Sequence, residues 1–196
     1  MGLACSSLVI ALLSGCATNQ GGSTAAVESA PQTELSHKER QYIAAPPKVK
    51  LSEFTSVEIK ATDIAANYRT EGNWKSAGKI DTMIQGGLKS RWPNLKIIPA
   101  NGEFSKGNER TLQIIPCIDD IHIVSVAARV WIGVMAGGSD LVMHVDFRDS
   151  ATGELVANPQ FWSGNNAWQG GASHGQADNQ IRDSVSSQIV GYTLSN

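Results

Sequence analysis

One stretch of strict alternation, residues 141–148, constrains the fold of this chain more than any other part of its sequence. Every second residue there is a large apolar one: Leu141, Met143, Val145 and Phe147. The residues between them are Val142, His144, Asp146 and Arg148. A period of two places alternate side chains on opposite faces of a β-strand, so the pattern predicts a strand with one buried face. Such a strand needs neighbours to pair with and a second layer to cover its apolar face.

The remaining periodicities supply those neighbours and that layer. Alternating residues predict a strand near 49–61. Short runs rich in apolar and β-branched residues predict strands at 95–99 and 112–124, where Pro116 suggests a bulge or an edge position. Apolar residues at helical spacing from Ile80 predict a helix that Pro93 ends, and a second helix closes the chain between Ala177 and Tyr192. A turn at 149–153 allows 155–163 to return as a hairpin. The order predicts one α/β (α+β) domain over 48–196, a mixed β-sheet with two main helices packed on it.

The first residues predict an export signal. Residues 3–15 are apolar or small, which suits a signal peptide and is too short to span a bilayer. The run ends at Leu13-Ser14-Gly15-Cys16, which resembles the lipobox of bacterial lipoprotein precursors. The resemblance implies cleavage between Gly15 and Cys16 and attachment of lipid to Cys16. Two alternatives stay open: the start Met1-Gly2 also fits N-myristoylation, and the run could be an apolar element of the domain.

Residues 16–47 predict a flexible linker behind the lipidated cysteine, because they are rich in Thr, Gln, Gly, Ser, Ala and Pro. Ala17 is not an aspartate, and by resemblance to sorting rules in enteric bacteria this favours the outer membrane, with the domain facing the periplasm. The formal net charge is −2, and no basic block is present that could follow a phosphate backbone. We therefore expect a membrane-lipid contact through Cys16 and no nucleic-acid partner.

A family resemblance rests on the segment from Arg129 to Glu154. It contains a glycine-rich run ending in Gly137-Gly138-Ser139, the strand 141–147 and the turn from Asp149 to Gly153. This resembles an uncharacterised domain family of short Gram-negative lipoproteins, and it covers roughly residues 45–196. The resemblance implies a fold similar to the amino-terminal domain of the Tol translocation protein and to the curli-secretion lipoprotein. It implies no catalytic residues.

Four side chains form the main candidate for metal chemistry. Asp120 and His122 lie two residues apart on one predicted strand, and His144 and Asp146 lie two apart on another. If the strands are neighbours, these carboxylates and imidazoles are suited to zinc. The simpler interpretation is a solvated face of the sheet. Cys117, alone in an apolar run, is predicted to be a buried and inert thiol.

Three further segments carry weaker hypotheses. The uncharged run 130–139 could contact an envelope protein or a second copy of the chain, through Trp131, Ile132, Gly133, Met135, Gly137 and Gly138. Trp162 and Trp168, set among amides and glycines, could stack on glycan or peptidoglycan. Residues 171–175 match the Gly-x-Ser-x-Gly form of a hydrolase elbow, but no histidine follows in the chain. The sequence therefore predicts a non-enzymatic envelope lipoprotein without a cofactor, with metal binding and glycan binding as alternatives.

Overall fold

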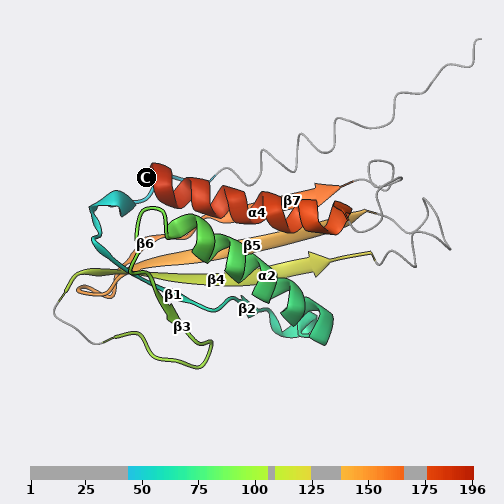
Figure 1. The fold of residues 1–196 in the computed structure, drawn as a ribbon, viewed down its shortest axis with the longest axis horizontal. Helices are drawn as coiled ribbons and strands as arrows, with labels where there is room; N and C mark the ends of the chain where they lie inside the picture. Colours follow the sequence, from blue (N-terminus) through green and yellow to red (C-terminus); the bar gives the residue numbers. More distant parts are fainter. Residues whose placement is uncertain (1–43, 106–108, 125–137, 166–175) are drawn as a thin grey trace, which may run out of the picture. The chain divides into compact units, whose positions relative to one another are not determined.

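The sheet is the framework of the domain. The computed structural model describes residues 44–105, 109–124, 138–165 and 176–196 (Figure 1). Within these ranges seven strands form one mixed sheet in the order β3-β1-β4-β5-β6, with β2 also beside β4 and β7 also beside β5. The strands are β1 (Ser56–Lys60), β2 (Asp63–Ile64), β3 (Lys96–Ile98), β4 (Thr111–His122), β5 (Ser139–Asp149), β6 (Leu155–Ala157) and β7 (Gln160–Asn165). The predicted α/β (α+β) class, a mixed sheet with two main helices, is confirmed.

One half of the sheet is parallel and the other half antiparallel. β1 and β3 are parallel neighbours, and the chain between them forms helix α2 (Glu71–Leu88). Parallel neighbours need such a crossover because a tight turn cannot join them. β1 also runs parallel to β4, whereas β4 pairs antiparallel with β5, and β5 pairs antiparallel with both β6 and β7.

Both long helices are longer than the stretches that their apolar periodicity indicates. The difference is largest at the start of α2. Thr70 caps α2 by accepting a hydrogen bond from the backbone N–H of Asn73 at 3.2 Å. Sequence periodicity placed the start near Ile80, because the first turn of α2 is largely exposed and carries no apolar stripe. The second helix, α4 (Gln176–Ser195), closes the chain. Among the described residues, neither helix combines the length and apolar character that crossing a bilayer requires.

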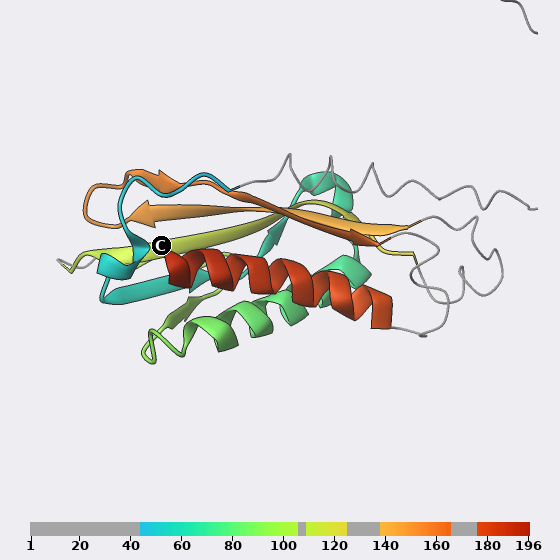
Figure 2. The ribbon, with the colours of Figure 1, turned by 90° about the horizontal axis from the view of Figure 1, so that it is seen from above.

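The two helices cover the same face of the sheet (Figure 2). The alternate residues of β4 and β5 that point toward them are buried together with the inner faces of α2 and α4. This core contains Ile114, Ile118, Leu141, Met143, Val145 and Phe147 from the sheet and Ile80, Ile84, Val185 and Ile189 from the helices. Burying each such side chain stabilises the fold by roughly 1.5–3 kcal/mol. The opposite face of β4 and β5 has no helix on it in the described structure, and its side chains are mostly half-buried.

Pro116 lies in a central strand, and the structure explains how β4 accommodates it. The backbone N–H of Val145, which lies opposite Pro116, donates to Pro159 on the other side of β5. Pro116 and Val145 therefore form a non-hydrogen-bonded pair, and the missing N–H of Pro116 faces β1 and β2. On that side the β1 pairing stops at Ile114 and the β2 pairing starts at Cys117. The predicted bulge is present, but between Ile118 and Asp120.

Two sequence predictions differ from the structure in detail. The first strand was predicted to include Leu51, which instead lies in a short 3₁₀ helix, η1 (Leu51–Glu53), ahead of β1. A second 3₁₀ turn, η2 (Ala66–Tyr68), precedes α2. The returning segment 155–163 forms two strands rather than one, because Pro159 interrupts it, and both pair with β5.

Candidate functional site

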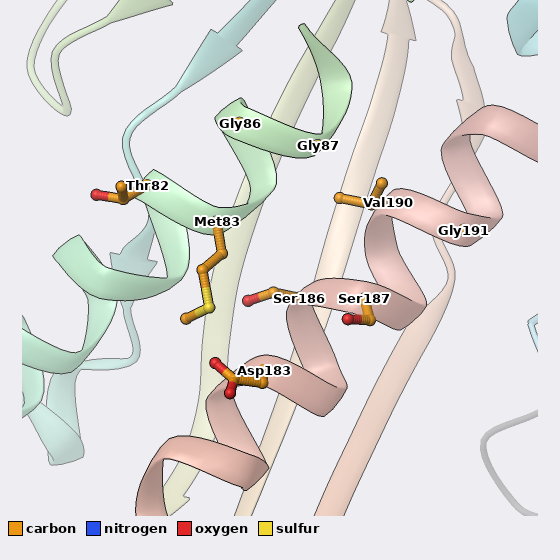
Figure 3. A pocket seen from close by; sticks show the side chains of 9 residues that line it. All are labelled: Thr82, Met83, Gly86, Gly87, Asp183, Ser186, Ser187, Val190 and Gly191. Atoms are coloured by element: carbon orange, nitrogen blue, oxygen red, sulfur yellow. The ribbon is translucent and has the colours of Figure 1, made fainter. Parts of the chain in front are cut away.

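An open groove of about 520 Å³ runs between α2 and α4 on the outer side of the helix layer (Figure 3). Small side chains from both helices line it, together with one flexible and one branched apolar residue. The lining consists of Thr82, Met83, Gly86, Gly87, Asp183, Ser186, Ser187, Val190 and Gly191. Met83 points into the space between the helices (Figure 3). A groove of this composition can accept an apolar side chain, since thioether side chains adapt to irregular shapes.

Close contact between the helices limits the groove at one end. A Cβ atom added to Gly87 would lie 2.8 Å from each methyl carbon of Val190, so α2 and α4 meet there without room for a side chain. The hydroxyl of Ser186 is buried and has no hydrogen-bond partner in the described structure. An unsatisfied buried hydroxyl is costly, and because this oxygen has almost no exposed surface it offers the groove no polar contact.

The second candidate lies on the face of the sheet opposite the helices. The register aligns Asp63 of β2, Cys117 of β4, His144 of β5 and Gln160 of β7 in one row across four strands. Asp119 has no paired residue on β5, because the bulge in β4 falls at its position. Its side chain lies on the same face of the sheet, where it contacts His144. Side chains that were far apart in sequence are brought together by this alignment.

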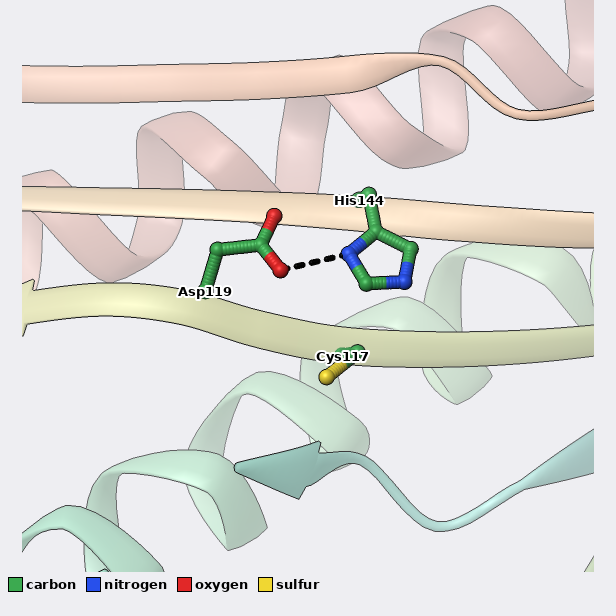
Figure 4. Close-up of side chains that lie close together, drawn as sticks. All are labelled: Cys117, Asp119 and His144. Carbon is green, nitrogen blue, oxygen red and sulfur yellow. Dashed lines mark hydrogen bonds and ion pairs between the residues drawn. The ribbon is translucent and has the colours of Figure 1, made fainter. Parts of the chain in front are cut away.

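Within that row, Cys117, Asp119 and His144 form a compact group that we call the Cys-Asp-His cluster (Figure 4). One potential ligand atom from each lies within 4.8 Å of those of the other two. Nδ1 of His144 and Oδ1 of Asp119 are joined by a hydrogen bond of 2.6 Å. Both side chains are 30% exposed, so the group is open to solvent on one side.

The electrostatics of the Cys-Asp-His cluster are dominated by carboxylates. Burial, together with the charges of Asp119 and Asp63, raises the pKa of the Cys117 thiol to about 11. Arg69 acts in the opposite direction and is itself paired with Asp63 at 3.3 Å. The thiol of Cys117 is therefore protonated at neutral pH in the protein as described. It is half-buried, so the predicted fully buried thiol is wrong in its degree of burial.

The structure does not bring together the four residues proposed from sequence as metal ligands. Asp120 interacts with the hydroxyl of Tyr68, and this hydrogen bond raises the pKa of Tyr68. His122 is exposed and lies opposite Asp140 at the far end of the strand pair. Asp146 binds Arg148 at 2.8 Å and also Asn158. Only His144 belongs to the cluster, because the β4 bulge places Asp119 rather than Asp120 beside it.

Sequence reasoning missed Asp119 and misjudged Cys117. Both lie on β4 two residues apart, which is the same spacing that suggested the other pairs. That spacing was the available signal, but the position of the bulge decides which acid meets the histidine.

The glycan-binding hypothesis is not supported by the described residues. Trp162 is only 8% exposed, and the backbone carbonyl of Trp162 accepts a hydrogen bond from Gln188. A buried indole offers no free face for a sugar ring. Trp168 lies outside the described residues.

The other predicted site residues also fall largely outside the described structure. Gly15 and Cys16 precede it, and 171–175 lie in one of its gaps. Of the predicted partner surface, Gly138 alone is described, directly before β5. The remaining members, Trp131, Ile132, Gly133, Met135 and Gly137, stay a prediction.

Comparison with known proteins shows a likeness in fold only. No protein-family model matches the chain, and no curated protein matches it. Among solved structures, the PelC dodecamer from Paraburkholderia phytofirmans is 9% identical with a TM-score of 0.47, covering 76% of this chain and 92% of that one. Protein XCC0632 from Xanthomonas campestris is 11% identical with a TM-score of 0.44, covering 78% and 91%. Lipoprotein GNA1162 from Neisseria meningitidis is 8% identical with a TM-score of 0.38, covering 70% and 99%. At these values no family is assigned, and the predicted family resemblance is supported only as a likeness to small bacterial proteins that include a lipoprotein.

Proposed function

We propose that this chain is a lipid-anchored envelope protein whose α/β domain is a non-enzymatic binding module. The observation that carries the proposal is the apolar run of residues 3–15 that ends at Cys16. A diacylated or triacylated cysteine holds a protein on a membrane far better than a single acyl chain. The linker of residues 16–47 then keeps the domain within reach of the membrane surface.

The anchor is tested by labelling cells with a palmitate analogue and determining the mature start by mass spectrometry. Cys16→Ser should abolish both label and cleavage. Cys5→Ser is the matched control, because Cys5 lies within the same apolar run and should leave both unchanged. Label that persists in Cys16→Ser and disappears in Cys5→Ser would instead support the myristoylated and palmitoylated alternative.

The outer membrane is the proposed destination, on the strength of Ala17 following the anchor. Membranes separated on a density gradient should contain the protein in the outer-membrane fraction. Ala17→Asp should move it to the inner-membrane fraction if the sorting rule of enteric bacteria applies. Ala17→Ser, which adds polarity without charge, should not move it.

For the binding role, the proposed partner is another envelope protein or a second copy of this chain. Two surfaces support it: the predicted segment containing Trp131 and Met135, and the open groove between α2 and α4. A photo-crosslinking residue placed in intact cells at Thr82 or at Trp131 should give an adduct of discrete mass. The same residue at Trp74, which is exposed on α2 and points away from the stripe that lines the groove, is the control. Equal adducts from all three positions, or none from Thr82 and Trp131, would contradict a specific partner surface.

A further inference from the structure

We propose that the Cys-Asp-His cluster is a zinc-binding site on the open face of the sheet. Cys117 supplies a thiolate sulfur, Asp119 a carboxylate oxygen and His144 an imidazole nitrogen, and water completes the coordination. These are three of the donor types that zinc prefers, and three protein ligands with one open position is an established zinc arrangement. This inference goes beyond the proposed lipid anchor and partner binding.

The spacing of the donor atoms fits such an ion after a small adjustment. With Zn–N or Zn–O bonds of about 2.0–2.1 Å and a Zn–S bond of about 2.3 Å, tetrahedral ligand atoms lie about 3.3–3.6 Å apart. The three donor atoms already lie within 4.8 Å of one another. Asp119 and His144 are closer, at 2.6 Å, because a proton now joins them. Zinc would take the place of this proton and of the thiol proton: the ring proton would move to Nε2, which keeps the imidazole neutral, and the thiol proton would pass to solvent.

An unpaired buried oxygen provides a second, independent observation. Oδ2 of Asp119 is buried and has no hydrogen-bond partner in the described structure, although Oδ1 is bound to His144. A buried carboxylate oxygen without a partner loses its hydration and gains nothing in return. A cation beside this carboxylate would compensate for that loss. The partial exposure of both side chains leaves a path for the ion from solvent.

Neighbouring strands add negative charge around the same position. Asp63 on β2 lies opposite Cys117, and Asp146 on β5 follows His144 on the same face. Both carboxylates raise the pKa of the Cys117 thiol, because their negative charges disfavour the negatively charged thiolate. The same fields attract a divalent cation, although Arg69 and Arg148 partly offset them through their ion pairs. Of the donors present, the sulfur and the nitrogen favour zinc over calcium or magnesium.

The test uses the full chain carrying Cys5→Ser and Cys16→Ser, purified in detergent, so that Cys117 is its only thiol and no lipid is attached. Zinc is titrated in competition with a chromophoric chelator. Cobalt(II) is then bound in its place and its absorption recorded. We expect one equivalent of zinc per chain, and a cobalt spectrum with tetrahedral visible bands and a thiolate-to-cobalt charge-transfer band. Each of Cys117→Ala, Asp119→Asn and His144→Gln should weaken zinc binding by at least about tenfold.

Two matched controls come from the same strand. Asp120→Asn and His122→Gln make the same chemical changes at residues outside the cluster, and each should keep the parent affinity within about twofold. If these two variants lose zinc while the cluster variants keep it, the proposal is overturned in favour of the grouping predicted from sequence. Substoichiometric binding by the parent also overturns it. Circular dichroism checks that each variant is folded. If a cluster variant does not fold, the cobalt spectrum of the parent decides, because a spectrum without a thiolate band excludes Cys117 as a ligand.

Discussion

Gly86 and Gly87 are adjacent in α2, yet the structure predicts opposite effects for alanine at the two positions. A Cβ at Gly86 has no neighbouring atom within 4 Å, whereas one at Gly87 would meet both methyl carbons of Val190 at 2.8 Å. Alanine in a helix interior is favoured over glycine by about 0.5–1 kcal/mol, and Gly86→Ala should gain this amount. At that stability change the melting temperature should rise by a few degrees.

Gly87→Ala should gain the same helix propensity and lose more through crowding. Carbon atoms prefer separations of about 3.5–4.0 Å, so the new methyl group would overlap Val190 on both branches. Val190 is β-branched and stiff in a helix, and rotation about χ1 cannot move both branches away at once. Overpacking of this kind costs about 1–3 kcal/mol. Gly87→Ala should therefore be about 1–3 kcal/mol less stable than Gly86→Ala.

Urea denaturation of the parent, the two single variants, Val190→Ala and the double variant Gly87→Ala/Val190→Ala measures the effect. In the Val190→Ala background, alanine at Gly87 should cost much less than in the parent, because the two crowded methyl groups are gone and only the Cβ of residue 190 stays close, at 3.3 Å. Equal stability of the two single glycine variants would refute the close approach of α2 and α4. The close approach would also be refuted if Gly87→Ala changed the free energy of unfolding by the same amount in the parent and in the Val190→Ala background.

Three further predictions concern polar contacts and one turn. Asp81→Ala should lower the free energy of unfolding by about 2–4 kcal/mol, because the buried N–H and hydroxyl of Thr62 donate to Oδ1 of Asp81 at 3.0 and 2.6 Å. Asp81→Asn keeps that oxygen and should cost clearly less in the same urea titration. Burial alone would raise the pKa of Asp149, but its hydrogen bond from Arg110 at 2.7 Å helps to hold the pKa below the ordinary value. This contribution to stability is present above the unfolded pKa of about 3.9 and lost as pH falls through the folded value. The stability difference between the parent and Asp149→Asn should therefore shrink between about pH 6 and about pH 3, and a constant difference would contradict the assignment. Gly153 has a φ of 71°, so Gly153→Ala should cost about 1–2 kcal/mol by thermal unfolding, and Gly153→Asn less.

Local periodicity was a sufficient guide to most elements. The alternation of residues 141–147 predicted β5, because side-chain direction in a strand depends only on the strand itself. Apolar and β-branched runs predicted β4 and β3. The turn at 149–153 was also predictable, since Gly153 occupies a conformation that other residues avoid. The start of α2 was missed because its first turn is exposed, and an exposed turn has no apolar pattern to detect.

The sequence by itself therefore determined the class of fold and the buried face of β5, and it predicts the anchor at Cys16, because these depend on patterns within short segments. Only the tertiary structure decided which side chains meet on the open face. One extra residue at the bulge of β4 moves Asp119 beside His144 and leaves Asp120 with Tyr68. The register of two strands that are distant in sequence comes from their packing against α2 and α4, and no local pattern contains that information.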